Sequence, residues 1–277
     1  MINSNSSLNV YSPTSLKDLL QLYKKIPTAH LYGGGTDILK DQSRKYLKLP
    51  ENLIYLKKVP ELSYITRTER YLEIGSCVTI NRILSIGNHV VPEALFSALQ
   101  SITPPSIKNL VTIGGNIFTK RNTYPVLLLM NISIELKSSD SSRWIQINKL
   151  FSNNGKIELS PNEIITRIRI PFETGNKQTF SIFGDLCFCS LANIQKNVLN
   201  NINFLFHIFD GNSYRSREVE AEVSGHNLPL SDRTVGYITG LFVSFMEKHD
   251  ISPYHRAYIN NLLTSYLKNL SGEEAVY

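Results

Sequence analysis

The first apolar residues of the chain recur at helical spacing. Between Ser15 and Tyr23 they stand three and four positions apart, which predicts a helix over about residues 14–25 with Ser15 as its N-cap. A short apolar segment, residues 29–32, then ends in three glycines, and Thr36 or Asp37 can cap a brief helical turn that follows. The pattern is therefore helix, strand, glycine loop and helix start.

Short segments rich in β-forming residues follow, and segments with helical spacing separate them. We expect strands at residues 52–56, 63–66, 71–76, 133–137 and 163–171. We expect helices at residues 79–84 and 93–99, the second with Pro92 near its start. Helices and strands thus alternate through the first part of the chain.

The segment of residues 106–117, SIKNLVTIGGNI, interrupts this alternation. Its apolar residues predict a strand-like run that ends abruptly at Gly114, Gly115 and Asn116. Because glycines let a ligand come close to the main chain, we expect this turn to present backbone groups.

A polar segment at residues 173–178 predicts a linker. We therefore expect two domains, residues 1–172 and 173–277. In the second domain we expect strands at about residues 179–183, 187–195 and 202–209, and helices at about 234–248 and 253–270.

Composition excludes several classes of protein. No stretch of about eighteen apolar residues occurs and the first residues lack the apolar core of a signal peptide, so we expect a cytoplasmic protein without membrane contact. The three cysteines, Cys77, Cys187 and Cys189, lack the CxxC spacing of zinc or iron–sulfur sites. The net charge of +6 is spread along the chain, which argues against nucleic-acid binding. It suits a phosphate-bearing cofactor and an acidic protein partner equally well.

The two glycine clusters are the candidate binding elements. Successive glycine amides form concavities that bind anions, so the loops at residues 33–37 and 112–116 can converge on one elongated anionic ligand such as a dinucleotide. The spacing matches neither a Walker nor a Rossmann loop, and a tight structural turn explains each cluster by itself. Lys120 and Arg121 either reach a phosphate or lie in a solvated turn.

No side-chain motif for acid, base or nucleophilic catalysis accompanies these loops. The six histidines stand apart from one another, and neither HExxH nor GxSxG occurs. Any reaction therefore belongs to a cofactor.

Taken together, the motifs resemble the FAD-binding subunits of molybdenum hydroxylases of the xanthine dehydrogenase and carbon monoxide dehydrogenase type. Residues 33–39, GGGTDIL, are similar to the family's first flavin loop, commonly AGGTDLL, and residues 107–117 to its second, commonly IRNVATIGGNI. Further similar segments occur in the expected order at residues 52–62, 73–80, 163–171 and 215–221. The resemblance covers almost the whole chain.

The resemblance implies an α+β fold: a two-part FAD-binding domain of the vanillyl-alcohol-oxidase-like (PCMH) type, followed by a small antiparallel sheet with helices. It implies FAD in this chain, and molybdopterin and [2Fe-2S] clusters only in partner subunits, with NAD as a possible electron acceptor. The implied cofactor-binding residues lie in the two glycine loops: Tyr32, Gly33, Gly34, Gly35, Thr36, Asp37, Thr112, Ile113, Gly114, Gly115 and Asn116. No catalytic side chain and no metal ligand follow from it.

Two segments depart from the family pattern. Residues 118–127 are shorter than the usual ANASPASDLLPAL and carry Lys120, Arg121 and Tyr124 in place of small residues and an Asp. Residues 180–187 lack the basic residues common near the domain junction. Two alternatives stay open at this point: a homologue that has lost FAD and serves as a scaffold, and a stand-alone flavin reductase of the same superfold.

Overall fold

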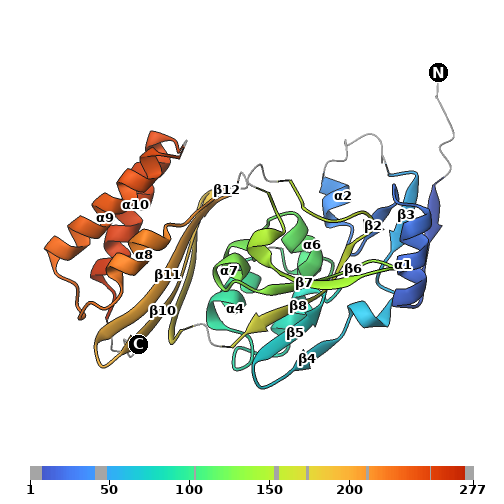
Figure 1. Cartoon of the computed structure of the whole chain (residues 1–277), viewed down its shortest axis with the longest axis horizontal. Helices are drawn as coiled ribbons and strands as arrows, with labels where there is room; N and C mark the ends of the chain where they lie inside the picture. The colour runs from blue at the N-terminus through green and yellow to red at the C-terminus, as the bar shows by residue number, and fades with distance from the viewer. Residues whose placement is uncertain are drawn as a thin grey trace. The chain divides into compact units, whose positions relative to one another are not determined.

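The structure is a computed structural model that describes residues 8–40, 49–102, 104–152, 156–172, 175–209, 212–249 and 251–271. It divides into two compact units, residues 1–172 and 173–277. Figure 1 shows the chain with its elements labelled. Among the residues described, no helix combines the length and the apolar character needed to cross a membrane.

The first unit begins with a small parallel sheet. Strands β1 (Asn9–Tyr11), β3 (Asn52–Tyr55) and β2 (His30–Tyr32) pair in that order. Helix α1 (Leu16–Lys25) packs Leu19 against Ile54 and Leu62 in one buried cluster. As predicted, Ser15 caps α1, and its side chain accepts the Asp18 N–H at 3.1 Å. The short helix α2 (Thr36–Lys40) follows the three glycines, also as predicted.

A five-stranded antiparallel sheet forms the rest of the first unit. Its order is β4 (Ile65–Arg67), β5 (Tyr71–Gly75), β8 (Ile164–Pro171), β6 (Ser133–Lys137) and β7 (Ser142–Gln146). Helices accompany it: α3 (Ile80–Leu84), α4 (Glu93–Gln100), α5 (Pro105–Lys108), α6 (Ile113–Phe118) and α7 (Tyr124–Leu129), with the 3-10 turns η1 (Pro60–Leu62) and η2 (Ile147–Lys149). Figure 1 shows α4, α6 and α7 gathered on one side of the sheet. The alternation of buried and half-buried residues along β8 fits a sheet with one covered face.

The described residues of the second unit form an antiparallel sheet and three helices. Strands β12 (Asn212–Tyr214), β11 (Val198–Ile208), β10 (Leu186–Gln195) and β9 (Lys177–Phe183) pair in that order. Helices α8 (Arg217–Val223), α9 (Asp232–Glu247) and α10 (Pro253–Lys268) lie on one side of it (Figure 1). Phe204 and Phe206 of β11 and Phe242 of α9 are fully buried in the shared core.

The structure corrects several expectations. Residues 106–117 form no strand, because Pro105 opens the short helix α5 and the Thr112 side chain caps α6 by accepting the Gly115 N–H at 3.2 Å. In this segment Thr112 makes an isolated bridge with Thr79. The expected linker is shorter, since Lys177 and Gln178 already belong to β9. Strand β7, which carries the single Trp, was not predicted.

Candidate functional site

The first glycine loop lies between the end of β2 and the start of α2. Gly35 has φ +72°, a left-handed conformation that side chains other than glycine rarely adopt. The Tyr32 ring covers Gly35, because a Cβ on Gly35 would overlap the phenol oxygen of Tyr32. The loop is therefore a tight turn closed on one side by its own preceding residue.

The second glycine segment is the first turn of α6. Thr112 is its N-cap, and Ile113, Gly114, Gly115 and Asn116 are its first residues. Here the sequence-based expectation of presented amides is wrong, because these amides already have acceptors within the protein. The distances are 3.0 Å from Ile113 N to Val78 O, 2.9 Å from Gly114 N to Ser76 O, 3.2 Å from Gly115 N to Thr112 Oγ1 and 3.0 Å from Asn116 N to Thr112 O.

The structure brings the two segments into direct contact. A Cβ on Gly34 would overlap the backbone carbonyl of Leu110, and a Cβ on Gly33 would lie 3.2 Å from Thr112 Oγ1. Gly34 is thus needed for the close approach of two backbones rather than for an unusual dihedral angle. The rigid start of α6 serves as a support on which the first loop rests.

The amides of the first loop differ from those of α6, which have acceptors within the protein. Among the described residues, the N–H groups of residues 33–37 have no hydrogen-bond acceptor. Because an unpaired backbone donor costs free energy when water is removed from it, such a row of donors suits an anionic ligand. The uncommitted donors of the candidate site therefore belong to Gly33, Gly34, Gly35, Thr36 and Asp37.

Asn116 has a supporting role within this frame. It is buried, and its Oδ1 accepts the Thr123 N–H at 3.1 Å and the Thr123 hydroxyl at 2.6 Å. Its carbonyl also accepts the Arg121 N–H at 3.0 Å. These bonds hold the turn that follows α6.

The shortened segment after α6 folds back on its own unit. Lys120 has φ +49°, and its Nζ lies 4.2 Å from the centre of the Phe151 ring, a cation–π distance. Burial lowers the pKa of Lys120. Tyr124 packs edge-on against the same ring at 5.6 Å, and burial raises its pKa to about 12. Lys120 is thus a half-buried turn residue that packs on an aromatic ring, while Arg121 beside it is exposed.

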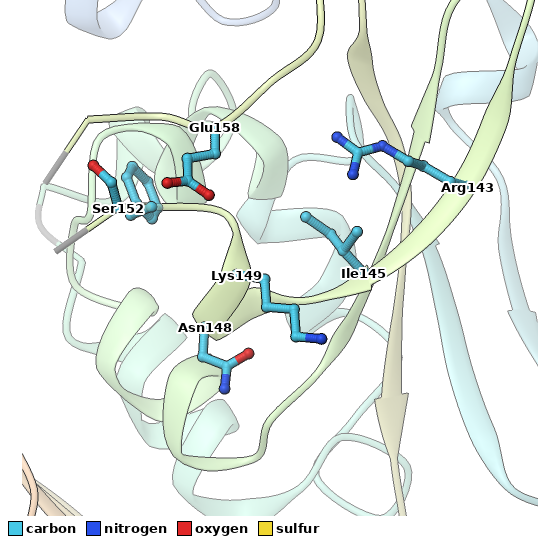
Figure 2. Close-up of a pocket in the computed structure, with 7 residues that line it drawn as sticks. Arg143, Ile145, Asn148, Lys149, Ser152 and Glu158 are labelled. Atoms are coloured by element: carbon cyan, nitrogen blue, oxygen red, sulfur yellow. The ribbon is translucent and has the colours of Figure 1, made fainter.

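A surface hollow of about 420 Å³ lies beside Phe151 and shares no residue with the glycine segments (Figure 2). Arg143, Lys149 and Glu158 line it. The Arg143 guanidinium is already paired with Glu163 through bonds of 2.7 and 2.8 Å. Within the described part of the chain, no group of three or more His, Cys, Asp or Glu side chains is placed to hold a metal ion.

A family model described as the FAD binding domain in molybdopterin dehydrogenase matches residues 6–173, the segment that contains both glycine loops. The chain belongs to this family. The predicted resemblance to FAD-binding subunits of molybdenum hydroxylases is thereby confirmed. The match assigns the FAD-binding domain to the first unit and leaves the individual contact residues as predictions.

Three relatives each match between 57% and 58% of this chain. The chain is 31% identical over 172 residues to the nicotinate dehydrogenase FAD-subunit of Eubacterium barkeri, covering 58% of this chain and 57% of that protein. It is 31% identical over 163 residues to the xanthine dehydrogenase FAD-binding subunit of Escherichia coli O157:H7, with 57% and 55% covered. Aldehyde oxidase 1 of Bos taurus is 29% identical over 175 residues, which are 13% of its length. The matches therefore span little more than half of the separate subunits and a small part of the oxidase.

Solved structures share the fold over nearly the whole chain. A carbon monoxide dehydrogenase chain from Hydrogenophaga pseudoflava aligns with a TM-score of 0.80 at 18% identity, covering 97% of this chain and 96% of that one. A chain of quinoline 2-oxidoreductase from Pseudomonas putida 86 aligns with a TM-score of 0.76 at 16% identity, with 95% and 94% covered. The α+β fold predicted from the family resemblance is confirmed for both units.

Three supporting residues of the site were not singled out from the sequence. Leu110 supplies the carbonyl against Gly34, and Ser76 and Val78 supply the carbonyls that accept the first amides of α6. Ser76 and Val78 lie in the segment of residues 73–80 that resembles the family, which was the available signal. All three residues act through their backbone carbonyls, so their side-chain chemistry gave no sign of this role.

Proposed function

We propose that this chain binds FAD and serves as the electron-transfer component of a molybdenum hydroxylase, an oxidoreductase of several subunits. Electrons would arrive from the [2Fe-2S] clusters of an iron–sulfur subunit, which receives them from a molybdopterin-binding subunit, and would leave to NAD or another acceptor. Family membership supports this proposal, as do relatives that are named as FAD subunits of dehydrogenases. A cytoplasmic location stays a prediction.

Among individual residues, the main support for this proposal is the backbone amides of residues 33–37, which have no acceptor among the described residues. We assign the pyrophosphate of FAD to them, since neighbouring backbone N–H groups in a glycine loop bind phosphate oxygens well. Thr112 and the first turn of α6 would fix the shape of the loop through Gly33 and Gly34. In this proposal, residues 33–37 donate hydrogen bonds to the ligand, and residues 112–116 support that loop.

Bound flavin supplies the redox chemistry itself. The chain's residues need only bind and orient the cofactor, which agrees with the lack of a catalytic side-chain motif. The substrate of the complex would be chosen by another subunit.

The test is reconstitution of the purified chain with FAD, removal of free FAD, and a visible spectrum before and after anaerobic addition of NADH. We expect a retained flavin band near one FAD per chain. Bleaching by NADH would identify NAD as the acceptor, whereas bleaching by dithionite alone would indicate a different acceptor. A folded chain that retains no flavin would contradict the proposal and favour the scaffold role.

A further inference from the structure

The five-stranded sheet of the first unit has a second face, opposite the one that its buried isoleucines form. Along β8, Ile168 and Ile170 are fully buried, whereas Arg167 and Arg169 alternate with them and are half-buried. The strand registers place cations, carboxylates and aromatic rings together on this second face, which we call the outer face: Tyr64, Tyr71, Glu73, Glu135, Lys137, Trp144, Arg167 and Arg169. The outer face shares no residue with the two glycine segments.

The carboxylates of the outer face lie beneath its cations. Glu135 accepts a hydrogen bond from Arg167 Nε at 2.8 Å, and the two side chains are 4% and 38% exposed. Glu73 accepts one from Arg169 Nε at 2.7 Å, and these side chains are 15% and 35% exposed. Lys137 adds a third cation, 3.3 Å from Glu135. In this cluster three cations therefore cover two carboxylates, and the surface that solvent reaches is positively charged.

Arg169 is fixed in position, yet the end of its side chain is uncommitted. Its guanidinium carbon lies 3.9 Å from the centre of the Trp144 ring and 6.0 Å from that of the Tyr71 ring, so it packs on both. The hydrogen bond to Glu73 uses Nε, and within the described part of the chain the two Nη nitrogens have no acceptor. A guanidinium held in this way can bind a carboxylate through two parallel N–H groups with little loss of side-chain entropy.

Exposed aromatic rings accompany these cations. The Tyr64 side chain is 61% exposed and that of Tyr71 is 37% exposed. Tryptophan, tyrosine and arginine are the residue types enriched at the energetic centres of protein–protein interfaces. A nucleic-acid surface fits less well, because it commonly makes about six to ten phosphate contacts, whereas each of the three cations of this cluster is already paired with a carboxylate. The outer face is thus suited to a protein.

We propose that the outer face docks a partner protein through an acidic segment. A carboxylate of that segment accepts hydrogen bonds from the two Nη groups of Arg169, and apolar residues beside it pack on Tyr71 and Tyr64. The net charge of +6 agrees with an acidic partner, since opposite charge speeds the encounter of two proteins. The inference goes beyond the proposed function, because docking on this face requires no bound FAD.

The experiment uses Trp144 as its reporter. It is the single tryptophan of the chain, so tryptophan fluorescence reports on the outer face. The probe is a hexapeptide of alternating leucine and glutamate, and its uncharged control alternates leucine and glutamine. We expect the acidic peptide to change the Trp144 emission of the full chain saturably and the control peptide to leave it unchanged. A DNA duplex that changes this emission while the acidic peptide does not would overturn the inference in favour of nucleic acid.

Variants locate the contact, with affinities taken from the fluorescence anisotropy of the dye-labelled acidic peptide. We expect Arg169→Gln to bind it about tenfold or more weakly, the usual loss of a hydrogen bond to a charged group. The matched control Arg67→Gln removes the same charge from β4, where Arg67 lies over the Phe172 ring, and should keep the affinity within about threefold.

Arg169→Lys is a second test that does not depend on the folding of Arg169→Gln. It keeps the charge but lacks the planar pair of N–H groups, so its affinity should fall between those of the wild type and Arg169→Gln. A folded wild-type chain that does not bind the acidic peptide, or wild-type affinity in both folded variants of Arg169, would overturn the inference. FAD retention, measured separately, decides the proposed function.

Discussion

At the scale of single residues, Gly34 is the position of the candidate site where an added Cβ would overlap the backbone of the second glycine segment. We expect Gly34→Ala to weaken FAD binding by at least tenfold, because the methyl group would overlap the backbone carbonyl of Leu110 and would push the two segments apart. Gly236→Ala is the control: it lies in α9 with no atom within 4 Å of the added methyl. Alanine there should leave FAD affinity unchanged and stabilise the helix by up to about 1 kcal/mol. Equal FAD affinities of Gly34→Ala and the wild type, measured by titration, would exclude the close approach as a requirement.

Asn116 gives a second prediction at this scale, one of stability. Asn116→Ala leaves the N–H and the hydroxyl of Thr123 without their buried acceptor, and Thr123 itself is fully buried. We expect a loss of about 1–3 kcal/mol in the free energy of unfolding in urea. Asn148→Ala, on the exposed surface of η2, should change it by less than about 0.5 kcal/mol. A loss no larger than that of the control would show that the Thr123 contacts do not hold the turn.

At the scale of elements, strands β6 and β8 are joined by an ion pair between Glu135, which is buried, and Arg167, which is partly exposed. Burial by itself would raise the pKa of Glu135, but hydrogen bonds from Arg167 and Thr166 and the charges of Arg167 and Lys137 outweigh it and lower this pKa to about 2. A carboxylate with a lowered pKa stabilises the fold above its unfolded pKa, near 4.5, and loses that contribution as pH falls towards 2. Unfolding free energy should therefore decline across this window in the wild type and decline less in Glu135→Gln. The same decline in both proteins, with exposed Glu158→Gln as the control, would contradict the assignment.

The elements themselves were predictable where local signals agree. Helix α1 has its apolar spacing, its Ser15 cap and a first-turn Asp, so its N-cap and its end at Lys25 were predicted, and the expected start lay two residues before Leu16. The strand predicted within residues 106–117 was wrong because local signals conflict there. Its apolar residues suit a strand, whereas Pro105 and the Thr112 cap favour short helices. Strand β7 was missed because its sequence, SRWIQ, alternates weakly, and it is held by pairing with β6 along its whole length.

At the scale of the whole molecule, each unit has its own buried core. The second unit centres on Phe242, which packs against Phe204 at 5.4 Å and Phe206 at 5.6 Å between ring centres. We expect Phe242→Ala to cost about 3–5 kcal/mol in this unit. By calorimetry it should lower one unfolding transition and leave the other, while exposed Tyr237→Ala lowers neither. A single transition that moves as a whole would show that the two units unfold together.

The contact between the two glycine segments was predictable from the sequence, whereas their hydrogen bonding was not. Two glycine clusters in an order typical of the family were enough to expect that they meet. The first amides of α6 have acceptors within the protein because tertiary packing brings the carbonyls of Ser76 and Val78 to them. The amides of residues 33–37 have no such acceptor among the described residues. Every residue type offers nearly the same backbone groups, so the sequence does not reveal backbone hydrogen bonds between distant segments.

The central claim is that residues 33–37 form a phosphate cradle for FAD. Equilibrium dialysis of the purified, folded chain against FAD tests it most directly, with Gly34→Ala and Gly236→Ala measured alongside. We predict close to one FAD per chain for the wild type and Gly236→Ala, and at least tenfold weaker binding for Gly34→Ala. A folded wild-type chain that takes up no FAD would contradict the account.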